Sequence, residues 1–268
     1  MADPNYPSHQ PIAPNRNAST AFNYVWDSKN DYWTPQSQSQ SSLIIGNAKS
    51  NIHKFGSHPS ITKAALPNEI WDGASSYTFP SDSGQSLKIK SSDGSDSQNV
   101  VVIGLDDAFK EQIKTVTLTG TTAVSIAGTW TRVYRMYNDS ASDFAGDISI
   151  TDTTQATTYA KVLGSNNQTL MSIYTIPSDY TGYLLNYKCS GHNAASSTII
   201  SYTVQIRTRE FGKAFRTREV FGVTTQTSVE YNFAFPMELP PKSDIVFTVT
   251  SANSNGGSVN ADFDIALL

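Results

Sequence analysis

The sequence has few of the residue patterns on which catalysis, metal binding and membrane insertion usually depend. It has one cysteine, Cys189, so no disulfide can form within the chain, and its four histidines lack a His or Cys partner at zinc-ligand spacing. No P-loop, Gly-x-Ser-x-Gly elbow or dinucleotide fingerprint is present. No apolar run approaches the ~20 residues that span a bilayer, and the N-terminus lacks the apolar core of a signal peptide. We therefore expect a protein that is made in a cytoplasm, is not a membrane protein, has no enzymatic activity and needs no cofactor or metal.

Charged residues are also scarce. They make up 16% of the chain, with a net charge of −4 and a pI near 5.5. A domain that neutralises nucleic-acid phosphates usually has a strong basic excess. The composition therefore argues against specific nucleic-acid binding.

No amphipathic helix of ten or more residues is evident, whereas period-two alternation is frequent. Ile200, Tyr202, Val204 and Ile206 share one face of a predicted strand. In the run from Val259 to Leu267, apolar residues occupy every odd-numbered position, while Asn260, Asp262 and Asp264 point the other way. Many short strands separated by turn residues predict an all-β fold, a β-sandwich that is jelly-roll-like.

The chain divides into three parts by composition. Ser, Asn, Gln and Pro supply 27 of the first 60 positions, so residues 1–60 are predicted to form an extended arm that cannot bury a core of its own. Residues 61–152 form a first β region and residues 153–268 a second. Whether the two β regions are separate sandwiches or one domain is left open by the sequence.

Two sets of residues are candidates for partner binding. Five aromatic residues lie in the polar arm and are predicted to be its anchors: Phe22, Tyr24, Trp26, Tyr32 and Trp33. Four arginines flank a predicted hairpin turn at 211–215: Arg207, Arg209, Arg216 and Arg218. They are interpreted either as a solvated charge ladder balanced by Glu210 and Glu219, or as a docking stripe for an acidic protein surface or for nucleic acid.

Other polar and aromatic residues favour a structural interpretation. Cys189 lies in a strand-like run and is expected to be a small interior residue. Asp93 and Asp96 suggest a calcium loop but lack its further ligands, and Asp262 and Asp264 are expected on a solvated face. A sugar-stacking platform is a further alternative, although at least half of its candidates are expected in the core: Trp71, Tyr77, Trp130, Tyr134, Tyr137, Tyr180 and Tyr183.

Six stretches between residue 100 and the last strand carry a family resemblance. They are VVVIGLDDAFKEQIKTVTLTGTTAVS from Val100, Trp130–Arg135, Asn167–Pro177, TVQIRTREFG from Thr203, Leu239–Ile245 and the closing Ala261–Ile265. In these stretches the chain resembles β-rich virion structural proteins of tailed bacteriophages of marine bacteria. The resemblance covers about residues 68–268, leaves the arm unexplained and brings no catalytic motif. It implies a virion component assembled in the host cytoplasm.

Two functions of different classes are consistent with these observations. The first is a capsid decoration or cement protein that stabilises the shell through its β-domain and arm. Its expected partners are the major capsid protein or other virion proteins, and it is expected to form a homo-oligomer, with a trimer favoured. The second is a receptor- or glycan-binding module of a tail fibre or spike.

Overall fold

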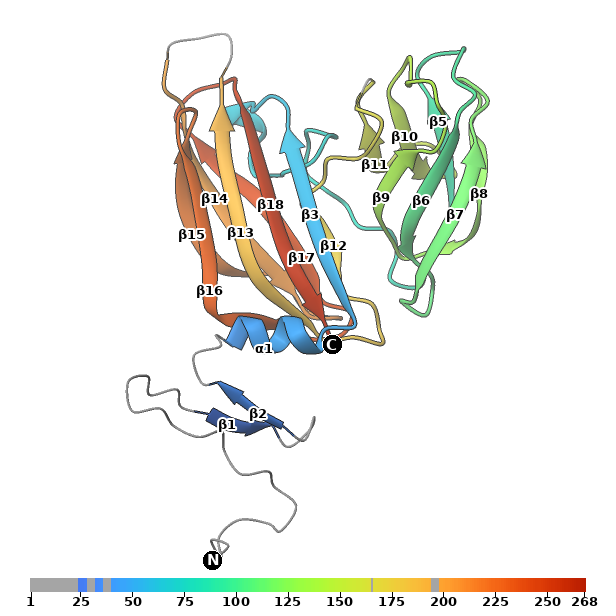
Figure 1. Ribbon diagram of the computed structural model, residues 1–268. Coiled ribbons are helices and arrows are strands. Elements are labelled where there is room, and N and C mark those ends of the chain that lie inside the picture. The colour runs from blue at the N-terminus through green and yellow to red at the C-terminus, as the bar shows by residue number, and fades with distance from the viewer. Residues whose placement is uncertain (1–23, 28–31, 36–39, 165, 194–197) are drawn as a thin grey trace, which may run out of the picture.

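The short alternating runs of the sequence form antiparallel strands, as predicted, in two β-sandwiches that stand side by side (Figure 1). The computed structural model describes residues 24–27, 32–35, 40–164, 166–193 and 198–268. Within these ranges helix is confined to α1 (Gln40–Asn47) and the short 3-10 turn η1 (Lys63–Ala65). No helix of the described ranges has the length and hydropathy needed to cross a bilayer.

The first sandwich packs a four-stranded sheet, β11-β10-β5-β8, on a three-stranded sheet, β7-β6-β9. Its strands are β5 (Gln85–Ser91), β6 (Asn99–Leu105), β7 (Glu111–Thr117), β8 (Val124–Trp130), β9 (Arg132–Asn138), β10 (Ile148–Asp152) and β11 (Thr158–Val162). Its core contains Leu87, Val102, Trp130 and Ile150, all fully buried. Each such side chain contributes on the order of 1.5–3 kcal/mol by leaving water.

The second sandwich packs the sheet β16-β13-β18-β3 on the sheet β12-β17-β14-β15, to which β4 adds through β17. Its strands are β3 (Ser50–His58), β4 (Asn68–Glu69), β12 (Ile173–Thr175), β13 (Gly182–His192), β14 (Ser201–Arg209), β15 (Arg216–Thr224), β16 (Ser228–Leu239), β17 (Asp244–Ala252) and β18 (Ser258–Leu267). The alternation predicted for residues 200–206 and 259–267 is confirmed, because every predicted inward side chain of these two runs is buried.

The first sandwich is inserted into the second. The second sandwich takes β3 and β4 from before the insertion and β12 to β18 from after it. The sequence placed the boundary between its two β regions at 152/153, but β10 and β11 pair across this point. The intervening residues form a hairpin turn in which the Asp152 carboxylate accepts hydrogen bonds from Thr154 Oγ1 and Ala156 N. The polar run around residue 153 is therefore a turn within the first sandwich.

The predicted arm also ends earlier than residue 60. Residues 50–58 form β3, which pairs with β18 over nine residues, from Ser50↔Leu267 to His58↔Val259. Before β3, β1 (Tyr24–Asp27) and β2 (Tyr32–Pro35) pair antiparallel with one another, and the hairpin lies apart from both sandwiches (Figure 1). The part of the chain that can act as an arm is thus residues 1–39, with α1 as its junction to the second sandwich.

Candidate docking surface

One side of the second sandwich is open because both of its sheets end there in an edge strand. Among the described strands, β15 pairs with β14 alone and β16 pairs with β13 alone. The turn at 225–227 joins β15 to β16, so the two edges are consecutive in the chain and run in opposite directions (Figure 1). We call the surface formed by β15 and β16 the open side. Unpaired edges present backbone groups that can pair with another chain, and natural proteins usually protect them.

Aromatic rings fill the gap between the two edges. Tyr187 of β13 lies at the centre, with its ring 5.0 Å from Phe221 of β15 and 5.7 Å from Tyr231 of β16. Phe233 packs edge-on against Tyr231 at 4.9 Å. The Tyr187 hydroxyl donates to Glu219 Oε1 at 2.8 Å, and burial together with this carboxylate raises the pKa of Tyr187. The cluster fills the space between the two edge strands but stays in contact with solvent, because Tyr231 is 45% exposed.

Two further apolar side chains project from the open side. Val220 of β15 is 56% exposed and Phe235 of β16 is 74% exposed. Phe235 lies in a wide bulge, because Asn232 pairs with Asn186 and Met237 with Leu184, so that four residues of β16 face the single Leu185. Pro236 in the same bulge has no backbone N–H to donate. The bulge holds Phe235 outward, and such exposed aromatic side chains are typical anchors of protein interfaces.

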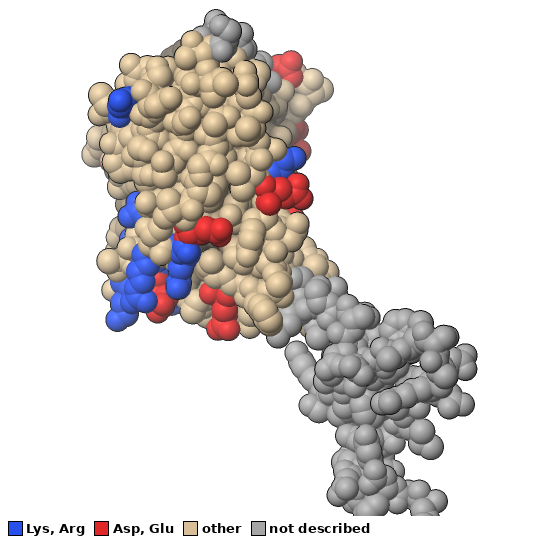
Figure 2. All heavy atoms as spheres, turned by 90° about the vertical axis from the view of Figure 1, so that its left-hand side faces the viewer, with Lys and Arg blue, Asp and Glu red and all other residues tan. Residues whose placement is uncertain are grey.

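Basic side chains of the open side gather at one end. Figure 2 shows that most of this side is uncharged and that basic side chains gather at its lower left, next to acidic ones. Arg216 and Arg218 are exposed at the start of β15, and Glu238 is exposed at the end of β16. Arg216 lies 3.7 Å from Glu210, and Arg218 donates from Nε to Thr208 Oγ1 at 2.7 Å.

The four predicted arginines do not form one stripe. Arg216 is the cross-strand partner of Thr208, whose side chain is buried, so it lies on the opposite sheet face from Arg207 and Arg209. The guanidinium of Arg207 lies 5.2 Å from the centre of the Phe215 ring. Arg209 pairs with the buried carboxylate of Asp244. Only Arg216 and Arg218 thus belong to the open side.

A buried ion-pair network joins the two sandwiches. Asp244 of β17 is 1% exposed and accepts hydrogen bonds from Arg132 Nε of β9 at 2.9 Å and from Arg209 Nε of β14 at 2.8 Å. Thr175 Oγ1 donates to the same carboxylate, and Arg132 also pairs with Asp82 at 2.8 Å. Burial alone lowers the pKa of Arg132, but the Asp244 and Asp82 carboxylates outweigh it and raise that pKa. Arg209 therefore has a structural role in this junction.

The arm aromatics are placed only in part. Phe22 lies outside the described residues. Tyr24 and Trp26 lie in β1, and Tyr32 and Trp33 lie in β2, with Trp26 and Trp33 as cross-strand partners. The structure brings four of the five predicted anchors into one hairpin.

The aromatic residues considered for sugar stacking are mostly interior, as expected. Trp71, Tyr77, Trp130 and Tyr134 are buried. Among the residues whose exposure the structure describes, the exposed aromatics are others, Tyr231 and Phe235 of β16 together with Phe211. Sequence reasoning missed them because Val229, Tyr231, Phe233 and Phe235 alternate as the inward face of a covered strand does.

The remaining polar candidates are explained by contacts within the chain. Cys189 is buried, as expected, and burial, with a smaller effect of Asp262, raises the pKa of its thiol to about 12. The Asp96 carboxylate accepts hydrogen bonds from Ser91, Ala145 and Gly146. Asp264 accepts from Asn186 and pairs with His53 at 2.7 Å. In the part of the chain that the structure describes, no cluster of three metal-ligating side chains is found.

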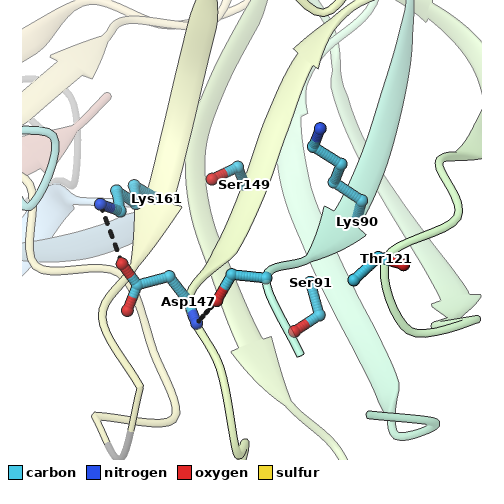
Figure 3. Close-up of a pocket in the computed structure, with 7 residues that line it drawn as sticks. Lys90, Ser91, Thr121, Asp147, Ser149 and Lys161 are labelled. Carbon is cyan, nitrogen blue, oxygen red and sulfur yellow. Dashed lines mark hydrogen bonds and ion pairs between the residues drawn. The ribbon is translucent and has the colours of Figure 1, made fainter. Parts of the chain in front are cut away.

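A shallow polar pocket lies on the outer face of the first sandwich. Lys90, Ser149 and Lys161 are cross-strand neighbours on β5, β10 and β11 and lie in a row (Figure 3). Asp147 pairs with Lys161 at 3.0 Å and accepts a hydrogen bond from Gly164 N. The pocket carries two ammonium groups and one carboxylate beside several hydroxyls, an arrangement suited to a small anionic or hydroxyl-rich group.

No protein-family model and no curated protein matches the chain. A solved structure described as "Structure of infectious bursal disease virus Gx strain" aligns with 81% of this chain and 75% of that chain, at 11% sequence identity and a TM-score of 0.22. A similarity this low carries no argument about fold or function.

Proposed function

We propose that the chain is a structural protein of a virus particle, and more specifically a capsid decoration or cement protein of a tailed bacteriophage, without enzymatic activity. The observation that carries this proposal is the open side, where two free edge strands carry the exposed Val220, Tyr231 and Phe235. Exposed apolar side chains on unpaired edge strands are suited to a permanent protein neighbour. The resemblance to virion proteins implies that this neighbour is a component of the particle, which includes other copies of the chain.

The N-terminal segment supports the same function. A two-stranded hairpin alone is at best marginally stable in water, and β1 and β2 pair only with one another in the described part of the chain. A hairpin of this kind gains stability when it docks on a neighbouring subunit. We propose that residues 1–39 grip the major capsid protein or another virion protein, and that α1 connects this segment to the second sandwich.

The proposal is tested on particles. Purified virions are analysed for the chain by quantitative mass spectrometry, and the recombinant chain is added to expanded capsids lacking it. We expect a fixed copy number per virion and saturable binding to the capsids. A variant that lacks residues 1–39 but keeps α1 and β3 is expected to bind fewer copies. Absence of the chain from virions, or binding that does not saturate, contradicts the proposal.

The alternative, a receptor- or glycan-binding module, loses most of the residues first considered for it, because buried Trp71, Tyr77, Trp130 and Tyr134 cannot stack on a sugar. The observation that still favours it is the polar pocket of Lys90, Ser149 and Lys161. An array of cell-surface polysaccharides separates the two functions. Binding of an acidic glycan that is lost on Lys90→Ala, but kept on Lys114→Ala outside the pocket, supports the alternative.

A further inference from the structure

The open side has a geometry that fits a second copy of the same chain. Its two free edges belong to different sheets and run in opposite directions on the same side of the sandwich. Rotation about an axis parallel to the strands keeps every residue at its height along that axis. Such a rotation sets β15 of one copy beside β16 of the next, and the two strands are antiparallel, as in every other strand pair of the sandwich.

Charge complementarity supports this arrangement. Arg216 and Arg218 lie within the first three residues of β15, and Glu238 is the last residue but one of β16. All three therefore lie at the end of the open side that is remote from the turn at 225–227. Because the rotation preserves height, it places the two arginines of one copy at the level of Glu238 of the next.

The apolar residues meet in the same arrangement. Val220 projects from β15, while Tyr231 and Phe235 project from β16, and all three lie between the two ends of the open side. Each copy has one β15 edge and one β16 edge. Contact between β15 of one copy and β16 of the next therefore covers these side chains in every copy of the ring. A contact between two different patches that closes by rotation gives a ring in which neither β15 nor β16 of any copy is left unpaired.

We propose that copies of this chain form a closed ring in which β15 of each copy docks on β16 of the next, with Arg216 and Arg218 facing Glu238. Rings of two and of three copies use this same contact. The inference names the partner of the open side used in the proposed function, and it is tested on the free protein so that the two can fail separately.

The test is a charge exchange read by the mass of the full-length chain in solution, measured by light scattering over a range of concentrations. The wild type is expected to be a dimer or trimer. Arg218→Glu and Glu238→Arg each place like charges across the contact and are expected to raise the dissociation constant about tenfold or more. The double variant R218E/E238R restores opposite charges and is expected to regain the ring. Asp107→Arg, an exposed change on the first sandwich, is the matched control.

Each outcome decides the question. A wild type that is monomeric at every soluble concentration overturns the inference. So does a ring that both single variants leave intact, because the copies then meet through another surface. If the double variant stays monomeric although its circular dichroism and unfolding match the wild type, the predicted facing of Arg218 and Glu238 is wrong. A chain that is monomeric in solution but present on virions contradicts only this inference and leaves the proposed function standing.

Discussion

Asp244 shows at the scale of one residue how the two sandwiches are held together. Its buried carboxylate accepts from Arg132 of the first sandwich and from Arg209 of the second. Removing one member of a buried pair leaves an uncompensated charge, at a cost of ~3–5 kcal/mol. We therefore predict that Asp244→Asn lowers the free energy of unfolding by about this amount in urea titrations. Asp82→Asn is the control, because Asp82 is 42% exposed and its pair with Arg132 contributes less than ~1 kcal/mol. Equal losses in both variants would contradict this account of the junction.

Lys54 of β3 is buried against β9 and donates a hydrogen bond to the Tyr134 carbonyl. Burial, with a smaller effect of Arg135, lowers its pKa from 10.5 to about 7. Between these values the unfolded chain binds a proton that the folded chain does not, so the free energy of unfolding rises with pH by up to ~1.4 kcal/mol per unit. This contribution is fully present above pH 10.5 and is lost as the pH falls to about 7.

We predict that Lys54→Met removes this rise. Urea unfolding of both proteins near pH 7 and near pH 10.5 measures it, with Lys114→Met, at a half-buried position of β7, as the control. The wild type gains stability relative to Lys54→Met as the pH increases. A constant difference between the two proteins contradicts the prediction.

Asp72 gives the opposite dependence. Its Oδ2 accepts from Leu170 N at 3.0 Å, while Oδ1 is buried without a hydrogen-bond partner among the described residues. Burial raises its pKa from 3.8 to about 7, so the folded chain binds the extra proton and stability falls as the pH rises between these values. Asp72→Asn can keep the bond to Leu170. We predict that this variant is more stable than the wild type near pH 7 and that the difference disappears toward pH 4, as measured by thermal unfolding.

At the scale of the element, β3 decides where the arm can be cut. β3 pairs with β18 along its full length, and its Lys54 contacts β9 of the first sandwich through the Tyr134 carbonyl. We predict that deletion of residues 1–39 leaves the unfolding midpoint unchanged, whereas deletion of residues 1–60 exposes the β18 edge and yields unfolded or aggregated protein. Size-exclusion chromatography and circular dichroism of the two truncations check this. A folded, soluble chain without residues 1–60 would mean that β3 is dispensable.

β18 and β3 also show what the sequence could and could not predict. β18 was predictable because its inward positions are apolar throughout. The inward positions of β3, which are cross-strand partners of buried β18 residues, are Ile52, Lys54, Gly56 and His58. These residues face the crowded region near the junction, where a Cβ at Gly56 would lie 2.2 Å from Ser172 N. Because Lys54 and His58 are polar, the segment has the composition of a linker, and only its pairing with β18 identifies it as a strand.

The open side was missed for a related reason. Alternation in β16 predicts a face that is covered, but it does not say by what. Within one copy, Phe235 is left uncovered by the bulge that four residues of β16 form opposite Leu185. The arginines were predictable as a charged feature of the hairpin. The sequence did not show that Arg209 pairs with Asp244 while Arg216 and Arg218 stay on the open side, because Asp244 is 35 residues away from Arg209 in the chain.

At the scale of the whole molecule, the insertion of one sandwich into the other sets the division of roles. The first connection between the sandwiches reaches the buried network through Asp82, which pairs with Arg132, and the second leads into β12, whose Thr175 donates to Asp244. The open side lies on β15 and β16, on the side of the second sandwich away from the first (Figure 1). A subunit built in this way can use one side for its neighbours while the first sandwich stays accessible.

The measurement that tests the central claim most directly is the number of copies bound per particle by matched serine variants. Phe235→Ser removes the most exposed large apolar side chain of the open side, and Ile113→Ser removes an exposed apolar side chain, 57% exposed, from the first sandwich. Neither change is expected to alter the free energy of unfolding by more than ~0.5 kcal/mol. We predict that Phe235→Ser weakens binding to particles about tenfold or more, as loss of an aromatic anchor does, and that Ile113→Ser binds as the wild type does. Equal binding by all three proteins would contradict the claim that the open side is the docking surface.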